Sequence, residues 1–303
     1  MSEVALGTVE LGMDYGMPVA GEHLRPSEAQ AARLLNRALD LGVNFIDTAR
    51  VYGASEEVIG RALKTRRREY ILATKLAPIR EEGQSDRELR EQVRASIGES
   101  LRALQTDVID LLQLHHAPVE VIREGRIVEA VREAQTAGDV RFIGASTYGE
   151  EAPLLALADG RYDCLQIAYS AVDRRPEARI LPLAQQKDVG IIVRSVLLRG
   201  VISHRYALLP AQLGELKAAI ARLDALRGAE AQSLPELAYR YVLAHEAVST
   251  ALVGTARVGE LEEVVGFADR PPLPAELVAA IRQIVVQDED QLHPGKWPAE
   301  MNA

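Results

Sequence analysis

Residues 108–115 read Val-Ile-Asp-Leu-Leu-Gln-Leu-His, a short and mostly apolar run that ends in a histidine. A longer stretch of helical character follows over Val119–Ala137, and Gly138 marks its end, as glycine commonly does. Another apolar run, Val140–Ser146, comes next. This succession predicts a strand, a helix and a second strand that runs parallel to the first.

The same alternation repeats along the chain. Eight apolar runs are predicted as strands: Val4–Thr8, Val43–Asp47, Tyr70–Lys75, Val108–His115, Val140–Ser146, Cys164–Ile167, Gly190–Ser195 and Thr250–Val253. Helix-like segments follow them: Glu28–Leu41, Ser55–Lys64, Asp86–Leu104, Val119–Ala137, Glu151–Leu157, Glu177–Gln186, Pro235–Ala244 and Glu260–Phe267. Strands this uniformly apolar are covered on both faces. The count of eight favours an α/β fold of the (β/α)8 TIM-barrel type over the alternative, an open doubly wound sheet.

Two predicted helices lie outside this repeat. One, Ala211–Leu226, follows the seventh strand, and the other, Glu276–Asp290, lies near the C-terminus. We find neither a linker nor a low-complexity stretch between the repeats. A barrel of this length is commonly one domain, so we expect residues 1–303 to form a single domain.

The overall composition excludes several classes of protein. The 303 residues carry a net charge of −9 and give a pI of about 5.3, which argues against nucleic acid as a partner. A single cysteine, Cys164, rules out a disulfide within the chain and fits a reducing cytoplasm. No apolar run approaches the roughly 18 residues that span a membrane, and no signal peptide is recognised. We therefore expect a cytoplasmic protein that acts on small molecules. No exposed apolar face stands out in the sequence, so a monomer is expected.

Polar residues stand where the predicted strands end. Asp47, Lys75 and His115 end the second, third and fourth strands, and Tyr52 follows in the loop after the second. Each alone has an ordinary structural explanation, such as a turn cap or a packed core residue. The C-terminal ends of barrel strands meet at one mouth, however, so we expect these four side chains to share a pocket.

This set of groups fits the reduction of a carbonyl. An ammonium paired with a carboxylate lowers the pKa of a neighbouring phenol, so Lys75 with Asp47 would make Tyr52 a usable general acid. His115 would be a second donor to the carbonyl oxygen. None of these groups supplies a hydride, so a cofactor is required. No Gly-x-Gly-x-x-Gly fingerprint follows the first strand, which counts against Rossmann-type binding.

Several runs together resemble the signatures of the aldo-keto reductase family across nearly the whole chain. They are Gly42-Val43-Asn44-Phe45-Ile46-Asp47-Thr48-Ala49 with Tyr52-Gly53, Ser55-Glu56 and Ile59-Gly60; Ala73-Thr74-Lys75; Asp107–His115; Arg141–Ser146; Gln166–Tyr169; and Arg194–Leu197. The resemblance implies an oxidoreductase that reduces an aldehyde or ketone, or oxidises an alcohol or sugar. It implies catalysis by Asp47, Tyr52, Lys75 and His115, with Tyr52 as the general acid and base.

The resemblance also implies an extended NADPH or NADH across the barrel mouth. The residues that match cofactor-binding positions are Thr8, Asp47, Ser146, Thr147, Gln166, Arg194, Ser195, Leu197, Gly254, Thr255 and Arg257. Among them, Ser146 and Gln166 match the positions that hold the carboxamide, and Arg194 matches the side chain that stacks on the nicotinamide ring.

The chain departs from the family pattern at several of these positions. Thr147 stands where asparagine is usual, and Gly254 replaces a frequent lysine. Glu260 falls where an arginine often clamps the 2′-phosphate, and Val264 falls where an asparagine often meets adenine. Arg257 could take over the phosphate, although Glu260 would repel it. NADPH is expected, with NADH possible.

Two loops and a tail residue are further candidates. The loop over residues 10–26 is expected to open on the substrate side, and the loop over residues 199–210 to cover the cofactor. Trp297 is a candidate for the pocket wall.

Two other functions remain open. A cofactor-binding regulatory protein of the same fold would keep a similar site, and a barrel lyase would use Lys75 to form a Schiff base. A metal site at His115-His116 is not expected, because the sequence shows no further ligands at suitable spacing.

Overall fold

The computed structural model describes residues 1–17 and 25–301, in which eight parallel strands close into a barrel. The strands are β1 Val4–Gly7, β2 Phe45–Asp47, β3 Ile71–Leu76, β4 Ile109–Leu114, β5 Val140–Ser146, β6 Cys164–Ala168, β7 Gly190–Arg194 and β8 Thr250–Gly254. Each strand pairs with the next in the sequence, and β8 pairs with β1 to close the barrel. The predicted TIM barrel is confirmed, and each predicted strand lies within two residues of its observed bounds.

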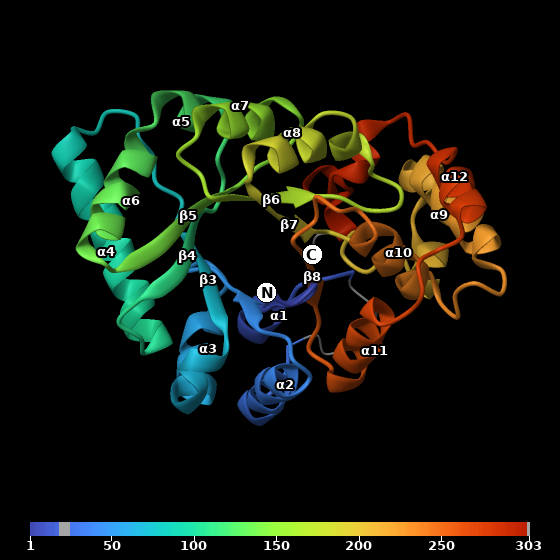
Figure 1. Ribbon diagram of the computed structural model, residues 1–303, viewed down its shortest axis with the longest axis horizontal. Helices are drawn as coiled ribbons and strands as arrows, with labels where there is room; N and C mark the ends of the chain where they lie inside the picture. The colour runs from blue at the N-terminus through green and yellow to red at the C-terminus, as the bar shows by residue number, and fades with distance from the viewer. Residues whose placement is uncertain (18–24, 302–303) are drawn as a thin grey trace.

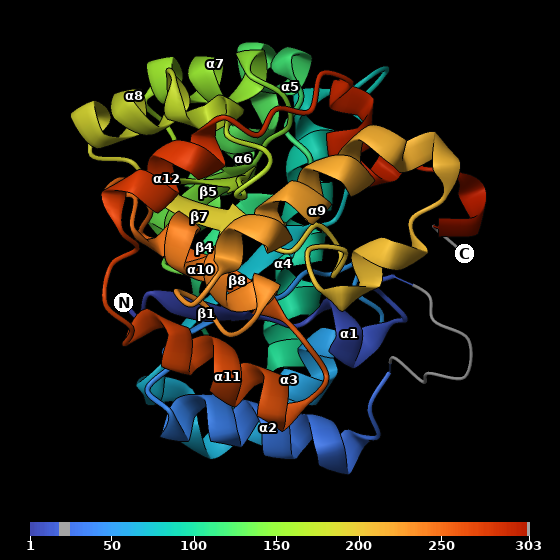
Figure 2. The same ribbon diagram turned by 90° about the vertical axis from the view of Figure 1, so that its right-hand side faces the viewer.

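The helices form a ring outside the barrel. They are α1 Val9–Gly12, α2 Glu28–Asp40, α3 Ser55–Leu63, α4 Asp86–Leu104, α5 Val119–Glu124, α6 Arg126–Ala137, α7 Glu151–Asp159, α8 Ile180–Lys187, α9 Gly214–Arg227, α10 Leu234–Leu243, α11 Val258–Ala268 and α12 Ala275–Arg282. Short 3₁₀ turns connect some of them: η1 Lys64–Glu69, η2 Arg175–Glu177, η3 His204–Leu208, η4 Ala211–Leu213, η5 Glu289–Leu292, η6 Pro294–Lys296 and η7 Ala299–Met301. Figure 1 shows the chain passing once around the barrel from blue to red. The added helix α9 packs against α10 and α12 (Figure 2).

Local sequence signals account for several helix starts. Ser27 caps α2 and Ser85 caps α4, in each case through a reciprocal pair of hydrogen bonds with the third helical residue, Gln30 or Glu88. Such a capping box satisfies backbone N–H groups that would otherwise have no partner at the first turn. The predicted first residues of these helices, Glu28 and Asp86, are confirmed.

Four helix predictions were wrong in their bounds. The helix expected from Glu177 begins at Ile180, after the 3₁₀ turn η2. The stretch 119–137 is two helices, because Gly125 has a left-handed φ of 69° and the guanidinium of Arg161 lies against it. The helix expected from Ala211 begins at Gly214, after a 3₁₀ turn. The C-terminal helix ends at Arg282 instead of Asp290, where Arg174 donates hydrogen bonds to the carbonyl oxygens of Arg282 and Ile284.

The barrel interior has an apolar layer below a polar one. The apolar layer includes a cluster of buried residues from five strands: Ala5, Phe45, Ala73, Leu111 and Ile192. Side chains two positions apart on a strand face the same way. The residues two positions further along these strands are Gly7, Asp47, Lys75, Gln113 and Arg194, so the interior becomes polar toward the C-terminal ends of the strands.

Among the described residues, no helix is long and apolar enough to cross a membrane.

Candidate active site

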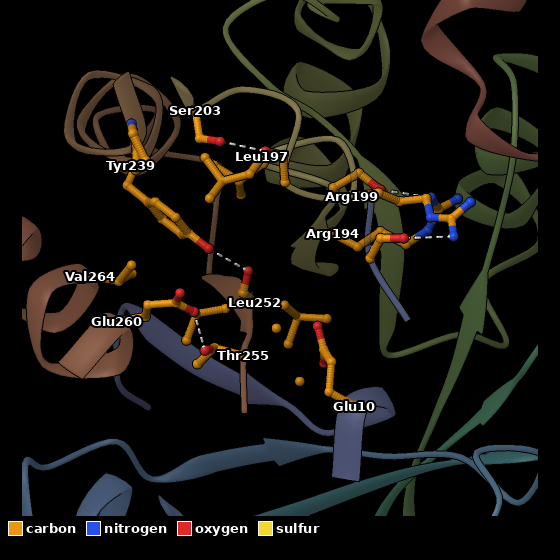
Figure 3. Close-up of a pocket in the computed structure, with 18 of the residues that line it drawn as sticks. Glu10, Arg194, Leu197, Arg199, Ser203, Tyr239, Leu252, Thr255, Glu260 and Val264 are labelled. Carbon is orange, nitrogen blue, oxygen red and sulfur yellow. Dashed lines mark hydrogen bonds between the residues drawn. The ribbon is translucent and has the colours of Figure 1, made fainter. Parts of the chain in front are cut away.

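A cavity of about 740 Å³ opens at the C-terminal ends of the strands. This volume lies within the range of ligand pockets, on the order of 300–1,000 Å³. Asp47, Tyr52, Lys75 and His115 line one part of the cavity, and Thr255, Glu260 and Val264 line another. Figure 3 shows Arg194 and Arg199 on one side and Tyr239 and Val264 on the opposite side. The structure therefore brings the four expected catalytic residues together.

Asp47 and Lys75 form a buried ion pair at the base of this cavity. The Nζ of Lys75 lies 2.5 Å from Oδ2 of Asp47 and donates to the carbonyl oxygen of Thr48 at 2.9 Å. Burial alone would lower the pKa of Lys75, but the carboxylate of Asp47 and the oxygen of Tyr52 together outweigh burial and raise it. Lys75 is therefore held as a cation.

Two glutamines complete the surroundings of Asp47. The Nε2 atoms of Gln113 and Gln166 each donate to Oδ1 of Asp47 at 2.9 Å. Gln166 was expected to hold the carboxamide of the cofactor, but its amide nitrogen bonds to Asp47, although the residue does line the cavity. Gln113 was not among the predicted site residues. Its position two residues after Leu111, on the inward face of β4, was the signal that could have found it.

Tyr52 stands between Lys75 and His115. The Nζ of Lys75 is 5.0 Å from the centre of the Tyr52 ring, and the Tyr52 and His115 rings meet edge to face at 5.4 Å. Burial raises the pKa of Tyr52, and the charge of Lys75 and its hydrogen bond to the phenol oppose that rise without cancelling it. The lowered pKa expected from the sequence was therefore wrong. Tyr52 is a neutral phenol at neutral pH, which is the form that donates a proton.

His115 is held neutral in the same site. Burial, together with the charge of Lys75, lowers the pKa of His115 to about 3. Its Nδ1 is buried and has no hydrogen-bond partner among the described residues. A neutral imidazole carries one N–H donor, so His115 can donate a hydrogen bond to an oxygen in the cavity.

Two glycines set the position of the loop that carries Tyr52. A Cβ on Gly12 would lie 1.6 Å from the carbonyl oxygen of Tyr52, and a Cβ on Gly53 would lie 2.3 Å from the carbonyl oxygen of Gly12. Gly53 also has a φ of 54°, a conformation that suits glycine. The end of α1 and the Tyr52 loop can therefore come together only because both positions lack a side chain.

A chain of buried hydroxyl groups ties the same loop to β1 and β2. Thr8 donates to the carbonyl oxygen of Asp47 at 2.9 Å, and Ser55 donates to Thr8. Thr48 donates to the hydroxyl oxygen of Ser55 at 3.0 Å. These bonds link the strand that carries Asp47 to the start of α3, immediately after Tyr52.

Most of the expected cofactor-binding residues lie on the cavity wall. They are Thr8, Asp47, Ser146, Gln166, Arg194, Ser195, Leu197, Gly254, Thr255 and Arg257. Thr147 does not line the cavity. It is buried beneath Arg194, whose Nη2 atom donates to the carbonyl oxygen of Thr147 at 3.1 Å. Its expected contact with the cofactor is not supported by this placement.

The loop after β7 has an uncommon backbone conformation. Ser195, Leu198 and Arg199 have φ values of 64°, 44° and 57°, although none of them is glycine. Such conformations cost on the order of 1–3 kcal/mol each and gather at ligand sites. Arg199 donates to the carbonyl oxygen of Gly16 at 3.0 Å and accepts from the backbone of Met17. The β7 loop is thus joined to the loop after α1, of which residues 18–24 lie outside the described part.

The far end of the cavity carries a bonded carboxylate. Glu260 accepts hydrogen bonds from Thr255 at 2.5 Å and from Arg257 at 2.9 Å. The negative charge of Glu260 therefore lies beside Arg257, as the sequence suggested. Val264 is buried on the same wall.

Aromatic rings lie against one another beside Arg194. The ring of Tyr148, which lines the cavity, is 5.2 Å from that of His293 and 5.5 Å from that of His116. The guanidinium of Arg194 lies over the ring of Tyr148, 4.1 Å from the ring centre. Trp297, in contrast, is buried and donates to the carbonyl oxygen of Gln291. It does not line the cavity, so its expected place in the pocket wall was wrong.

A metal ion is not indicated. Within residues 1–17 and 25–301, no group of three or more His, Cys, Asp or Glu side chains is arranged to hold one.

Comparison with known proteins identifies relatives along nearly the whole chain. A model described as the aldo/keto reductase family matches residues 3–286. L-galactose dehydrogenase of Arabidopsis thaliana is 30% identical over 88% of this chain and 83% of that protein. An uncharacterized oxidoreductase, YqkF of Bacillus subtilis, is 27% identical over 97% of this chain and 95% of that protein.

Solved structures resemble the fold as well. The holo form of aldo-keto reductase AKR11C1 from Bacillus halodurans is 30% identical, with a TM-score of 0.76 over 93% of this chain and 91% of that one. Glycerol dehydrogenase AKR11B4 from Gluconobacter oxydans is 25% identical, with a TM-score of 0.73 over 93% and 91% of the two chains.

Proposed function

The chain belongs to the aldo/keto reductase family and is an NAD(P)H-dependent oxidoreductase, and we propose that Tyr52 exchanges a proton with the oxygen of its substrate. The observation that carries the proposal is the position of Tyr52 between the buried Lys75–Asp47 pair and the neutral His115. Among these four groups, the phenol is the one proposed to donate the proton.

The cavity fits a nicotinamide dinucleotide. Its lining includes buried polar atoms that have no hydrogen-bond partner in the described part of the chain, among them Nδ1 of His115, Nε of Arg194 and Oε2 of Glu10. A ligand with hydroxyl and amide groups, which can donate, and phosphate oxygen atoms, which accept, can satisfy such groups. Ser146 and Arg194 would hold the nicotinamide end, and Thr255 and Arg257 would hold the adenosine end.

The chemistry of the site follows from these roles. The bound nicotinamide supplies the hydride, or accepts it in the reverse direction. Tyr52 donates its proton to the carbonyl oxygen, and Lys75 stabilises the phenolate that remains. His115 donates a hydrogen bond to the same oxygen and stabilises the charge that develops there. Asp47 keeps Lys75 charged and in place.

We infer that the substrate is a small aldehyde, ketone or sugar, or the corresponding alcohol. Polar and aromatic side chains lie in this part of the protein. Tyr148 lines the cavity beside Arg194, and His293 stacks on its ring. Two relatives bear the names L-galactose dehydrogenase and glycerol dehydrogenase, which supports a polyhydroxylated substrate. A single domain, a monomeric state and a cytoplasmic location remain predictions.

The Schiff-base alternative is disfavoured by the surroundings of Lys75. Schiff-base lysines react as neutral amines. Lys75 is fully buried, paired with Asp47 and held as a cation. A regulatory role without catalysis has no observation in its favour.

Titration with NADPH and NADH separately tests the proposal. The single tryptophan, Trp297, lies outside the cavity wall, so binding is best followed by the fluorescence of the reduced nicotinamide. We expect saturable binding, and oxidation of the nicotinamide when aldehydes or sugars are added. Failure to bind either dinucleotide would overturn the proposed function.

A further inference from the structure

Glu10 is a buried carboxyl group in the cavity that the mechanism above does not use. It lies in α1, directly after β1, and only 9% of the residue is exposed. It lines the cavity, and Oε2 is buried without a hydrogen-bond partner in the described part of the chain. Figure 3 shows its side chain between the wall that carries Thr255 and the wall that carries Arg199.

Gly254 makes room for this carboxyl group. Gly7 at the end of β1 pairs in register with Gly254 at the end of β8. A Cβ on Gly254 would lie 3.0 Å from Oε1 of Glu10, which is closer than side chains normally approach. The carboxyl of Glu10 therefore fills a space that any larger residue at position 254 would take.

The groups around Glu10 do not neutralise it. Glu260 on α11 repels its charge, and the phenols of Tyr15, after α1, and Tyr239, on α10, are also close enough to interact. Two cations, Arg194 at the end of β7 and Arg199 in the loop after it, line the same cavity. Arg194 bonds to Ser195 and to the carbonyl oxygen of Thr147, and Arg199 bonds to the carbonyl oxygen of Gly16. Burial, with the help of Glu260, raises the pKa of Glu10 to about 7.

We propose that Glu10 contacts the bound dinucleotide, and that its carboxyl group takes up a proton from solvent when this anionic ligand enters the cavity. The inference rests on the proposed function, because it assumes that a nicotinamide dinucleotide binds here. The pyrophosphate of such a ligand brings negative charge into a cavity from which water is displaced. A second negative charge on Glu10 would oppose binding, whereas a protonated carboxyl does not and offers a hydrogen-bond donor.

This coupling has a defined dependence on pH. A ligand that raises the pKa of Glu10 binds more tightly where the carboxyl is already protonated. The dissociation constant should therefore rise with pH above about 7, by at most about tenfold per pH unit for one proton. Below that pH, the affinity should level off.

Calorimetric titration with NADH tests the inference. NADH is the ligand of choice because the 2′-phosphate of NADPH itself titrates near neutral pH. At a fixed pH near 7.5 the binding heat is measured in two buffers with different ionisation enthalpies, so that the heat difference gives the number of protons taken up. We expect a substantial fraction of one proton for the wild type and none for Glu10→Gln.

A matched control is Glu263→Gln, which removes another carboxyl of the cavity wall and should leave the proton uptake unchanged. If Glu10→Gln fails to fold, carboxyl ¹³C NMR of the wild type gives the same information. One glutamate should titrate near pH 7 in the free protein and at higher pH with NADH bound. Proton uptake that survives in Glu10→Gln, or wild-type binding without any uptake, would overturn the role of Glu10. An absence of binding by either dinucleotide would instead overturn the proposed function.

Discussion

The Cα of Gly12 lies so close to Tyr52 that a Cβ on this glycine would be 1.6 Å from the carbonyl oxygen of Tyr52. The contact joins the end of α1 to the loop after β2. It places the proposed proton donor by backbone packing, in addition to the side-chain contacts of Tyr52 itself.

We predict that Gly12→Ala displaces the Tyr52 loop. The added methyl group has no space, so the substitution should cost on the order of 1–3 kcal/mol of stability and lower kcat. Gly259→Ala is the matched control, since a Cβ at this helical position meets nothing within 4 Å. Thermal unfolding and steady-state rates of both variants measure the difference. A Gly12→Ala protein with unchanged kcat and stability would contradict the packing argument.

The two directions of the reaction should respond differently to pH. Burial raises the pKa of Tyr52, so the phenol stays protonated through neutral pH, and carbonyl reduction at saturating cofactor should be nearly constant there. Alcohol oxidation needs the deprotonated form, so its kcat should rise with pH toward and above about 10. His115, with a pKa of about 3, should contribute no step near neutrality. Profiles of kcat in both directions test this, and an oxidation rate that falls with rising pH would contradict it.

Removing the charge of Glu260 should favour NADPH. Its carboxylate is bonded to Thr255 and Arg257 and would repel a 2′-phosphate. We expect Glu260→Gln to raise the affinity for NADPH relative to NADH by about tenfold, or ~1.4 kcal/mol. Glu262→Gln is the control, because Glu262 pairs with Arg37 and does not line the cavity. Equal effects of the two variants on the NADPH to NADH ratio would show that Glu260 plays no part in the choice.

Breaking the buried ion pair on one side should be costly. Lys75→Met leaves the buried carboxylate of Asp47 without its cation, which typically costs about 3–5 kcal/mol. Asp47→Asn is the second single variant, and it leaves the buried ammonium of Lys75 without its carboxylate. In the double variant neither charge remains, so the loss of stability should be smaller than the sum of the two single losses. Urea unfolding of the three variants measures the coupling. Additive losses would mean that the two charges do not stabilise each other.

The sequence was sufficient to predict the barrel. It was also sufficient to predict that four side chains share one cavity, namely Asp47, Tyr52, Lys75 and His115. Strand periodicity predicts the polar layer, because Asp47 and Lys75 stand two positions after the core residues Phe45 and Ala73. The same rule applied to Leu111 would have found Gln113. These features are local, so alternation along one strand reveals them.

Other features depend on contacts between distant parts of the chain. The surroundings of Glu10 follow from the register of β1 with β8, which pairs Gly7 with Gly254. The path of the tail depends on Gln291, whose side chain accepts from the backbone N–H of Leu216 and whose carbonyl oxygen accepts from Trp297. Trp297 does not line the cavity. The raised pKa of Tyr52 follows from its burial, which its neighbours in the sequence do not reveal.

The most direct test of the account is a comparison of Tyr52→Phe with the wild type in two measurements on the same samples. The substitution removes the phenol hydroxyl and keeps the ring that packs against His115. Titration should give a dissociation constant for the reduced dinucleotide close to that of the wild type. Stopped-flow oxidation of the nicotinamide by a reactive aldehyde should be slower by about 10²–10⁴-fold, the contribution expected of a general acid. A variant that binds the dinucleotide and reduces the aldehyde at close to the wild-type rate would contradict the assignment of Tyr52 as the proton donor.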